Sequence, residues 1–243
     1  MSSGRPRLIV AMGGGGFQME PENPLLDDHV LALARERSGR PTPRICLIPT
    51  ATGDDDALIA DFELLFSPPR AEPRVLRLFG RTHDRLTDVL QDQDAVYVPG
   101  GSTENLLALW RLHGLDGDLR AAWEAGVILA GMSAGAICWF EAATTDSFGP
   151  TLRPLRGGIG ILEGTFVPHL HGEAQRLALL RRLVGDGTIP PGFGVDDGAA
   201  LVFRDRELVE VVTSDPNAGA WRFEPDGRGG AIETALPTRF LGA

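Results

Sequence analysis

The sequence predicts an α/β fold with a mostly parallel central sheet, and three observations lead to this prediction. Apolar runs of four or five residues recur up to about residue 140, and each ends at glycine or proline. Segments with helical spacing of apolar residues lie between these runs. Neither a flexible linker nor an internal repeat divides the chain, so we expect residues 1–243 to form a single α/β domain with residues 1–5 frayed.

The predicted strands are the apolar runs themselves. Aliphatic and β-branched residues that fill both faces of a short run suit parallel strands covered by helices on both sides. Glycine or proline at the end of each run marks the turn into the next helix. The five strands predicted in this part of the chain cover residues 8–12, 45–48, 75–79, 95–98 and 127–130.

Helices are predicted between these strands. Asn23 and Pro24 are typical of an N-cap and a first helical position, and apolar residues then follow at spacings of three and four. Ser102 is placed to cap a helix over residues 104–112. Strand and helix alternate, which predicts right-handed βαβ units. The remaining predicted elements are helices over 54–66, 115–125 and 173–184, and a hairpin of strands 200–203 and 208–212.

Composition excludes several classes of protein. The chain carries 23 Lys and Arg against 33 Asp and Glu, a net charge of −10, whereas a nucleic-acid binder needs a basic face. The first apolar run, residues 8–12, is too short for a signal peptide or a membrane span. Only Cys46 and Cys138 occur, both in apolar runs, which excludes a disulfide framework. We therefore expect a cytoplasmic protein with two buried thiols and no nucleic-acid or membrane partner.

Residues 127–139, VILAGMSAGAICW, have the pattern of a strand, a tight turn and the start of a helix. The GMSAG within them matches G-x-S-x-G, which in this context presents a serine hydroxyl at the C-terminal edge of a sheet. The two glycines remove side chains that would collide in so sharp a turn. We expect the amide of Ala134, helped by the positive end of the following helix, to face an oxygen held near Ser133. The alternative is a buried structural hydroxyl in a glycine-rich turn.

A nucleophilic serine needs a base, and the base needs an acid to orient it. His169 and His171 follow a short predicted strand, and among the five histidines they are the better candidates for the base. Two aspartates in residues 194–198, GVDDG, follow another apolar run and are candidates for the acid. The resulting order of Ser, His and Asp differs from the Ser, Asp, His order of α/β-hydrolases and argues against that fold.

Two other patterns favour weaker alternatives. His169, His171 and Glu173 have the spacing of metal ligands on one strand face, but Gly172 is expected to end the strand, so we expect no metal. The glycines at 13–16 fail the dinucleotide pattern at Gln18, so we also expect no cofactor. Close approach of this glycine-rich backbone to the active site is the more plausible role.

Four motifs, taken in order, resemble the peptidase E group of serine peptidases, to which cyanophycinases are related. They are Pro99-Gly100-Gly101, the elbow at Ser133, Pro168-His169, and VDDG at Asp197, and the resemblance extends from the first strand to about residue 222. It implies a class I glutamine amidotransferase-like (flavodoxin-like) fold, a three-layer α/β sandwich. It also implies hydrolysis of peptides, because the glutaminase relatives carry cysteine where this chain has Ser133. Members like peptidase E remove an N-terminal aspartate from short peptides, chiefly Asp-X dipeptides.

The resemblance also implies roles for individual residues. Ser133 matches the nucleophile, His169 the base, and Asp197 the acid, which is glutamate in many relatives. Asp146 also matches an acidic position of the family and is the alternative acid. The other implied residues are Gly101 and Ala134 as the oxyanion-hole amides, with Gly100 the nearest alternative donor, and Gly100, Ser102, His171 and Arg176 as substrate-binding residues. Ser102 stands where the family often has asparagine, and Arg181 and Arg182 are alternatives to Arg176.

Three functions follow from these observations. The first is a serine exopeptidase of the peptidase E type, with a small peptide as its partner. The second is a cyanophycinase-like or other aspartyl-peptide hydrolase. The third is an inactive amidotransferase-like binding module, whose signature would be the loss of the nucleophile, but Ser133 is present. The sequence leaves the oligomeric state open, a homodimer included.

Overall fold

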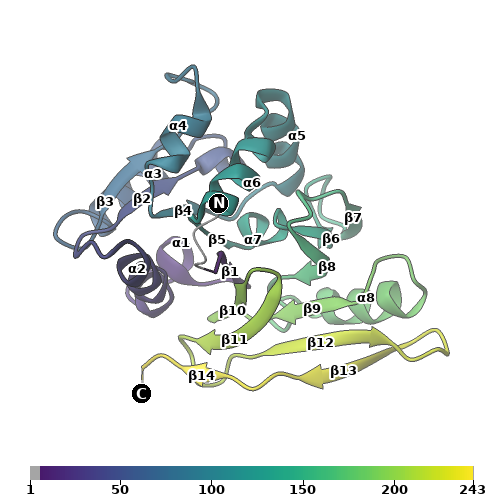
Figure 1. The fold of residues 1–243 in the computed structure, drawn as a ribbon. Coiled ribbons are helices and arrows are strands. Elements are labelled where there is room, and N and C mark those ends of the chain that lie inside the picture. Colours follow the sequence, from purple (N-terminus) through teal and green to yellow (C-terminus); the bar gives the residue numbers. More distant parts are fainter. Residues whose placement is uncertain (1–5, 243) are drawn as a thin grey trace.

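A computed structural model describes residues 6–242, and a large sheet forms its centre (Figure 1). Residues 1–5, predicted to be frayed, lie outside the described residues. The strands of this sheet are β1 (Leu8–Met12), β2 (Arg44–Leu47), β3 (Glu72–Val75), β4 (Ala95–Val98), β5 (Ile128–Met132), β10 (Ala199–Arg204), β11 (Glu207–Thr213) and β14 (Arg239–Phe240). Their order is β14-β11-β10-β1-β5-β4-β2-β3. Across the sheet, the adjacent strands β1, β5, β4, β2 and β3 are all parallel to one another. Strand β10 pairs with β1 and with β11 in antiparallel fashion.

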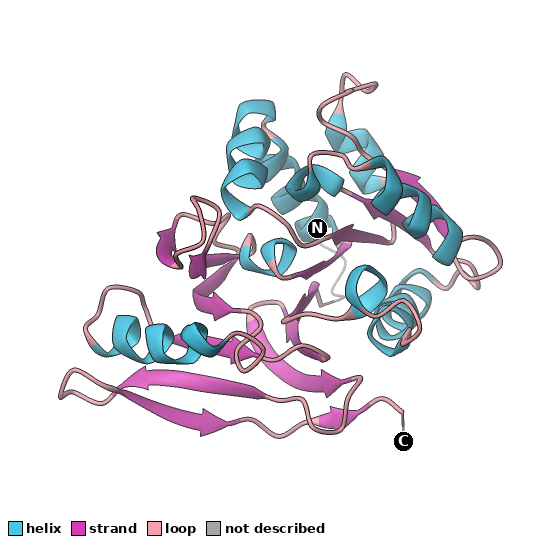
Figure 2. Ribbon diagram, turned by 180° about the vertical axis from the view of Figure 1, so that it is seen from behind, coloured by secondary structure: helices cyan, strands magenta, loops and turns pink. Residues whose placement is uncertain are grey.

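Helices cover both faces of the parallel strands (Figures 1 and 2). Successive strand residues point to opposite faces. Ile9 and Ala11 accordingly belong to one hydrophobic core with α5 and α6, and Val10 and Met12 to another with α1, α2 and α3. The predicted three-layer arrangement is therefore confirmed. The helices are α1 (Gly16–Met19), α2 (Leu25–Ser38), α3 (Asp56–Leu65), α4 (Leu86–Gln91), α5 (Thr103–His113), α6 (Leu115–Ala125), α7 (Ala134–Ile137) and α8 (Ala174–Gly185), with a 3-10 helix over Pro49–Thr52.

The second half of the chain builds a further sheet that the sequence did not predict. Its strands are β6 (Phe140–Thr145), β7 (Arg153–Arg156), β8 (Leu162–Val167), β9 (Gly192–Val195), β12 (Ala220–Pro225) and β13 (Ala231–Ala235), in the order β13-β12-β9-β8-β6-β7. Helix α8 packs on the long hairpin of β12 and β13 (Figure 1). Phe140 of this sheet contacts Phe203 of the first sheet, with ring centroids 5.7 Å apart. One hydrophobic core thus continues from sheet to sheet.

Several predicted elements are confirmed. Strands 8–12 and 95–98, helix 115–125 and the hairpin of β10 and β11 lie where the sequence placed them, and Ser102 caps α5 through the amide of Asn105 (3.4 Å). The predicted strand 75–79 was wrong, because β3 ends at Val75. The amides of Leu78 and Phe79 donate instead to the carboxylate of Asp54, each at 2.9 Å.

The predicted N-cap at Asn23 was also wrong. Helix α2 begins at Leu25 with Pro24 in the capping position and no side-chain cap. The amide side chain of Asn23 instead donates to the carbonyl of Ser214, 3.2 Å away, which is a contact with the distant strand end after β11. The Asn23 side chain therefore donates to Ser214 and to Glu20 and makes no capping bond.

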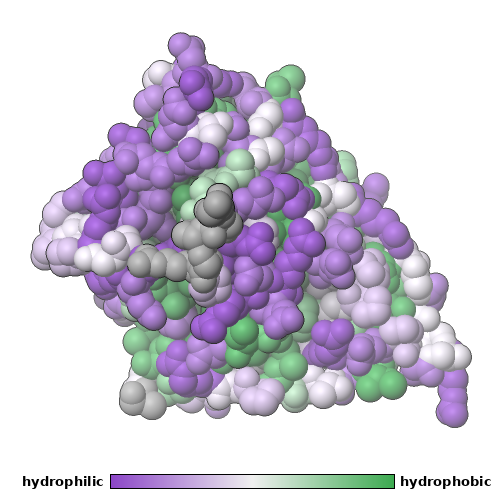
Figure 3. Space-filling model, viewed as in Figure 1, coloured by the Kyte–Doolittle hydropathy of each residue, from purple (hydrophilic) through white to green (hydrophobic). Residues whose placement is uncertain are grey.

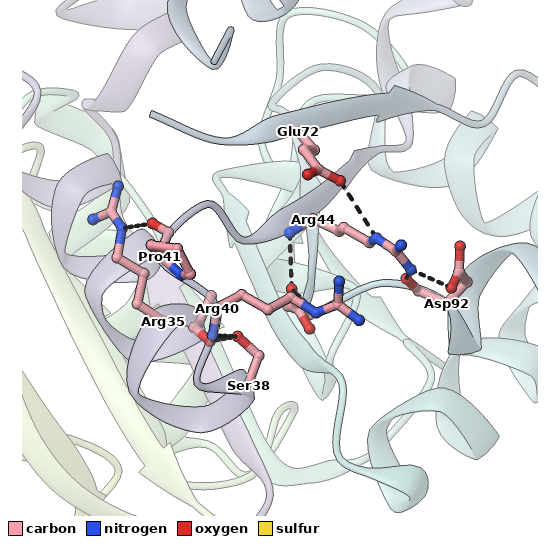
Figure 4. Close-up of polar contacts among 9 residues, drawn as sticks. Arg35, Ser38, Arg40, Pro41, Arg44, Glu72 and Asp92 are labelled. Carbon is pink, nitrogen blue, oxygen red and sulfur yellow. Dashed lines mark hydrogen bonds and ion pairs between the residues drawn. The ribbon is translucent and has the colours of Figure 1, made fainter. Parts of the chain in front are cut away.

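Polar contacts join the end of α2 to the start of β2, at the N-terminal edge of the parallel strands (Figure 4). The guanidinium of Arg44 reaches both Glu72 and Asp92. Arg35 donates from Nε to the carbonyl of Pro41, 3.1 Å away. These groups are partly exposed, so each ion pair contributes about 0–1 kcal/mol. These contacts hold the start of β2. They lie at the edge of the sheet opposite to the C-terminal ends of the parallel strands.

The face shown in Figure 3 is mostly hydrophilic, and its hydrophobic residues form separate patches. Within residues 6–242, no helix has the length and apolar character needed to cross a membrane.

A buried carboxyl group lies between α2 and β4. Asp27 is 1% exposed, and its Oδ1 accepts a hydrogen bond from the Tyr97 hydroxyl at 3.0 Å. Burial raises the pKa of Asp27 to about 6, against 3.8 for the free side chain, although the Tyr97 bond lowers it. Because the folded protein binds this proton more tightly than the unfolded chain, Asp27 lowers stability as the pH rises from about 4 to about 6. At about 1.4 kcal/mol per pKa unit, the loss is about 3 kcal/mol.

Asp27→Asn should therefore raise the free energy of unfolding at pH 8 by up to about 3 kcal/mol and change it little at pH 4. Asparagine keeps the acceptor for Tyr97 without carrying a buried charge. Denaturant unfolding at the two pH values, compared with the exposed Asp61→Asn on α3, measures the effect. An equal change at both pH values would mean that the charge of Asp27 is not its cause.

Candidate active site

A strained turn connects β5 to α7. Ser133 occupies this turn with φ 52° and ψ −113°, a conformation that residues other than glycine rarely adopt. Its amide donates to the carbonyl of Met12 at 3.1 Å, which ties the turn to the end of the neighbouring strand β1. The hydroxyl therefore lies at the C-terminal edge of the parallel strands.

The glycines on either side of Ser133 are required by the backbone. A Cβ atom on Gly131 would lie 2.1 Å from the carbonyl oxygen of Gly135. A Cβ atom on Gly135 would lie 2.1 Å from the carbonyl oxygen of Val98 in β4. The predicted need for glycine at both positions is confirmed, and the obstacles are main-chain atoms rather than opposing side chains.

The helix after the turn is shorter than the sequence suggested. Helix α7 spans only Ala134–Ile137, and a single turn has little macrodipole to offer an anion. The expected help from a helix dipole is therefore wrong, and what is available is the individual amide of Ala134. Among the described residues, that amide has no hydrogen-bond acceptor.

The structure brings Ser133, His169 and Asp197 together. His169 follows the end of β8, and its Nε2 lies 2.9 Å from Ser133 Oγ. Asp197 follows the end of β9, and its Oδ1 is hydrogen-bonded to His169 Nδ1. With Nδ1–H donated to the carboxylate, Nε2 presents its lone pair to the hydroxyl, which is the tautomer a general base needs. His169 also has a positive φ of 53°, so Ser133 and His169 both occupy strained backbone conformations.

Asp146, the alternative acid, lies elsewhere. It is an exposed residue of the turn after β6, where its carbonyl accepts the amide of Gly149 at 2.9 Å. Within residues 6–242, no hydrogen bond or ion pair joins its carboxylate to His169. The structure thus places Asp197, and not Asp146, against the imidazole.

The glycine-rich loop after β1 passes directly behind this pair. A Cβ atom on Gly14 would lie 1.9 Å from Asp197 Oδ1 and 2.9 Å from His169 Nδ1. The amide of Gly198 donates to the carbonyl of Gly14 at 3.1 Å, which fixes the loop beside the carboxylate. The close backbone approach predicted for this loop is confirmed, and any side chain at position 14 would displace Asp197.

The loop after β4 lies on another side of Ser133. A Cβ atom on Gly100 would lie 3.3 Å from Ser133 Cβ, and Gly101 has a φ of 142°, where a side chain would also meet the carbonyl of Ala51. The amide of Gly100 already donates to Gln18 Oε1 at 2.7 Å. The amide of Gly101 has no acceptor among the described residues. Within the described part of the chain, the amides of Gly101 and Ala134 are therefore both unengaged near Ser133.

Comparison with known proteins agrees with this arrangement. The model of peptidase family S51 matches residues 9–211. The chain belongs to peptidase family S51. This S51 peptidase is 44% identical to the uncharacterized peptidase YgaJ of Bacillus subtilis (strain 168) over 236 residues, which are 97% of this chain and all of that protein.

Two solved structures share the fold of this S51 peptidase. A peptidase from an acI-B1 actinobacterium superposes with a TM-score of 0.67 at 18% identity, over 97% of this chain and 96% of that one. A candidate peptidase E protein from Listeria monocytogenes EGD-e gives a TM-score of 0.57 at 15% identity, over 96% and 100%. The fold is the class I glutamine amidotransferase-like α/β fold that the resemblance to peptidase E implied.

A second histidine–aspartate pair lies beside the first in this S51 peptidase. Asp196 Oδ1 accepts hydrogen bonds from the amide of His171 at 3.2 Å and from its Nδ1 at 2.8 Å. The imidazole, about half exposed, also packs edge-on against Trp221, with ring centroids 4.5 Å apart. His169 and His171 thus bind different aspartates. Among the described residues, no group of three His, Cys, Asp or Glu side chains is placed to hold a metal ion.

The guanidinium of Arg176 is buried and engaged. Its side chain is 5% exposed, Nε donates to Glu173 Oε2 at 2.8 Å, and Nη2 donates to Glu173 Oε1 at 3.1 Å. Nη1 is buried without a hydrogen-bond partner. The alternatives on the same helix differ, because Arg181 pairs with Glu233 and Arg182 with Asp186 at the surface. A carboxylate can therefore reach Arg176 only where Glu173 now binds or at Nη1.

Neither cysteine is a candidate nucleophile. Cys46 and Cys138 are buried free thiols, as predicted. Burial raises the pKa of Cys46 to about 12 and that of Cys138 well above its usual range. Both therefore stay protonated at neutral pH, and the thiolate is the reactive form.

Three contacts of the site had no signal in the sequence that predicted them. Gln18 was visible only as the residue that breaks a dinucleotide pattern, and nothing in the sequence linked it to Gly100. Asp196 was one of two adjacent aspartates, with no signal for which imidazole each one binds. Trp221 lies in β12, a strand that was not predicted, so its contact with His171 had no sequence signal.

Proposed function

We propose that this S51 peptidase is a serine exopeptidase that hydrolyses short peptides with N-terminal aspartate through an acyl-enzyme. The observation that carries the proposal is the contact of Ser133 Oγ with His169 Nε2 at 2.9 Å, on a strained turn, with Asp197 on the far nitrogen of the ring. The Asp-X specificity comes from the resemblance of its four motifs to peptidase E. A cytoplasmic location stays a prediction from the sequence.

In the proposed mechanism, His169 takes the Ser133 proton as Oγ attacks the scissile carbonyl. Asp197 stabilises the imidazolium that forms. The amides of Gly101 and Ala134 bind the oxyanion, and one such donor is worth about 3–4 kcal/mol of the barrier. His169 then protonates the leaving amine, and water cleaves the acyl-enzyme by the same steps.

Recognition of an N-terminal aspartate needs a cation for the side-chain carboxylate and an acceptor for the free ammonium group. We assign the cation to Arg176, whose bond to Glu173 a substrate carboxylate would replace. An acceptor comes from the pair of His171, in the turn that carries His169, and Asp196, which follows β9. Gly100 and Ser102 form the opposite rim, where the Ser102 hydroxyl also caps α5.

A panel of dipeptides tests the proposal. Purified protein should cleave Asp-Leu with a kcat/KM at least about tenfold above that for Ala-Leu and Asn-Leu, since one charge-assisted hydrogen bond is worth about 1.5–3 kcal/mol. Preference for β-aspartyl-arginine would instead indicate a cyanophycinase-like hydrolase. No cleavage, together with no labelling of Ser133 by a fluorophosphonate, would indicate a binding module and overturn the proposal.

Arg176→Met should lower the ratio of Asp-Leu to Ala-Leu hydrolysis by about 10- to 100-fold, with most of the change in KM for Asp-Leu. Methionine keeps an apolar side chain of similar length in the buried position but removes the guanidinium. Arg182→Met, at an exposed position of the same helix, is the matched control and should leave the ratio unchanged. If both variants keep the original ratio while folded, Arg176 does not bind the aspartate carboxylate.

A further inference from the structure

Gln18 contacts both peptide groups of Gly100, the glycine next to the nucleophile. Its Oε1 accepts the amide of Gly100 at 2.7 Å, and its Nε2 lies 3.5 Å from the carbonyl oxygen of Gly100. The first bond is short and the second is at the limit for a hydrogen bond. One side-chain amide therefore clamps the N–H and the C=O of a single glycine, whose Cα lies beside Ser133.

The clamp decides which amide is left for the substrate. Bonded to Gln18, the Gly100 N–H is no longer available as an oxyanion donor. In a planar trans peptide the C=O and the following N–H point in opposite directions. Because the Gly100 carbonyl is turned toward Gln18, the Gly101 N–H is turned away from it. Gly101 also has a φ of 142°, a conformation that needs support from its surroundings.

Gln18 is itself held by the core. It lies on α1 next to Phe17, which is 3% exposed and packs edge-on against Phe62, Phe66 and Tyr97 with centroids 5.3–5.7 Å apart. The same segment carries Gly14, four residues earlier, against Asp197 and His169. One short stretch of chain after β1 thus supports both the oxyanion loop and the imidazole–carboxylate pair.

We propose that Gln18 is a positioning residue that fixes the Gly100–Gly101 peptide, so that Gly101 and not Gly100 supplies the second oxyanion donor. The inference rests on the proposed function, because an oxyanion forms only if Ser133 attacks a carbonyl. Gln18 touches no reacting atom. It acts through the loop by keeping a donor aimed before substrate arrives, which is what makes such donors effective.

Gln18→Leu tests this role, since leucine keeps an apolar bulk on α1 and removes both bonds. Loss of a whole oxyanion donor costs about 10²–10³ in kcat, so a misaligned one should cost about 10- to 100-fold. KM should stay within about threefold, because the ground-state carbonyl gains little from the donor. Gln91→Leu, at an exposed position on α4, is the matched control and should leave both constants unchanged.

A second measurement separates misalignment of the oxyanion donor from a general loss of protein stability. An aspartyl aldehyde adds to Ser133 and places an oxyanion in the hole, whereas the corresponding amino alcohol, aspartinol, keeps the ammonium group and the side-chain carboxylate but has no carbonyl carbon and forms no oxyanion. In Gln18→Leu the inhibition constant of the aldehyde should rise in parallel with the loss of kcat, and that of aspartinol should stay unchanged. Both inhibition constants are measured at a temperature well below the thermal midpoint of the variant. If Gln18→Leu does not fold, Gln18→Met takes its place.

Two results would overturn the inference. One is a folded variant with native kcat, and the other is an equal weakening of the binding of aldehyde and aspartinol. Failure of the proposed function would be distinguishable, because native protein would then not cleave Asp-X dipeptides at all. The rate at which a fluorophosphonate labels Ser133 would still report whether Gln18 aims the loop, since that reaction also develops an oxyanion.

Discussion

Replacing Ser133 with alanine should lower kcat for peptide hydrolysis by about 10⁵-fold or more and leave the fold intact. The change removes only Oγ, the atom that lies 2.9 Å from His169 Nε2. Without it no acyl-enzyme forms, and His169 and Asp197 have no nucleophile to activate. Removal of the nucleophile from a comparable triad costs about 10⁶ in kcat, and the residual rate comes from the oxyanion hole and substrate binding.

The measurement is steady-state hydrolysis of Asp-Leu together with the mass of protein treated with a fluorophosphonate. Native protein should gain one adduct at Ser133, and the variant should gain none. Ser67→Ala, in the loop after α3, is the matched control and should keep native turnover and labelling. Turnover within tenfold of native in a folded Ser133→Ala protein would contradict the serine mechanism.

The parallel half of the fold was predictable because local signals and tertiary structure agree there. The runs that became β1 and β4 are apolar on both faces, and both faces are in fact covered by helices. The prediction failed at residues 75–79, where the Asp54 carboxylate, not a strand neighbour, binds two main-chain amides. Such a long-range partner leaves no mark on local apolar periodicity.

The second sheet was not predicted as a sheet, because only the end of β8, predicted as a short strand over residues 165–168, and the apolar run in β9 carry part of that signal. Strand β6 starts three residues after the single turn of α7, and β9 contains two glycines in four residues. These strands are held by pairing with each other and by aromatic contacts such as Phe140 with Phe166, stacked at 5.0 Å. Pairing of this kind depends on context more than on propensity.

The candidate site was predictable to the extent that motifs mark it. The sequence proposed Ser133, His169 and Asp197 as partners, and the structure places the three side chains in contact, although their catalytic roles stay predictions. The supporting contacts were not visible, because Gln18 is 82 residues from Gly100 and His171 is 25 residues from Asp196. Sequence motifs identify Ser133, His169 and Asp197. The contacts that support these residues depend on which distant segments the fold brings together.

Asp197→Asn should lower kcat by about 10⁴-fold with little change in KM. An asparagine at this position presents either an NH₂ group, which cannot accept the Nδ1 proton, or a neutral oxygen, which stabilises the imidazolium less than a carboxylate does. In the first case the ring carries its proton on Nε2, facing Ser133 Oγ, and cannot act as the base. The first case removes the base and the second weakens it, and neither removes the nucleophile or the oxyanion amides.

Asp146→Asn is the matched control, because Asp146 is the alternative acid from the sequence but is an exposed turn residue in the structure. It should keep kcat within about twofold, as expected for a surface change away from the reacting groups. Hydrolysis of Asp-Leu by the two variants, at equal folded fraction by circular dichroism, makes the comparison. A larger loss in Asp146→Asn than in Asp197→Asn would require the β6–β7 turn to move against His169 during turnover and would reassign the acid.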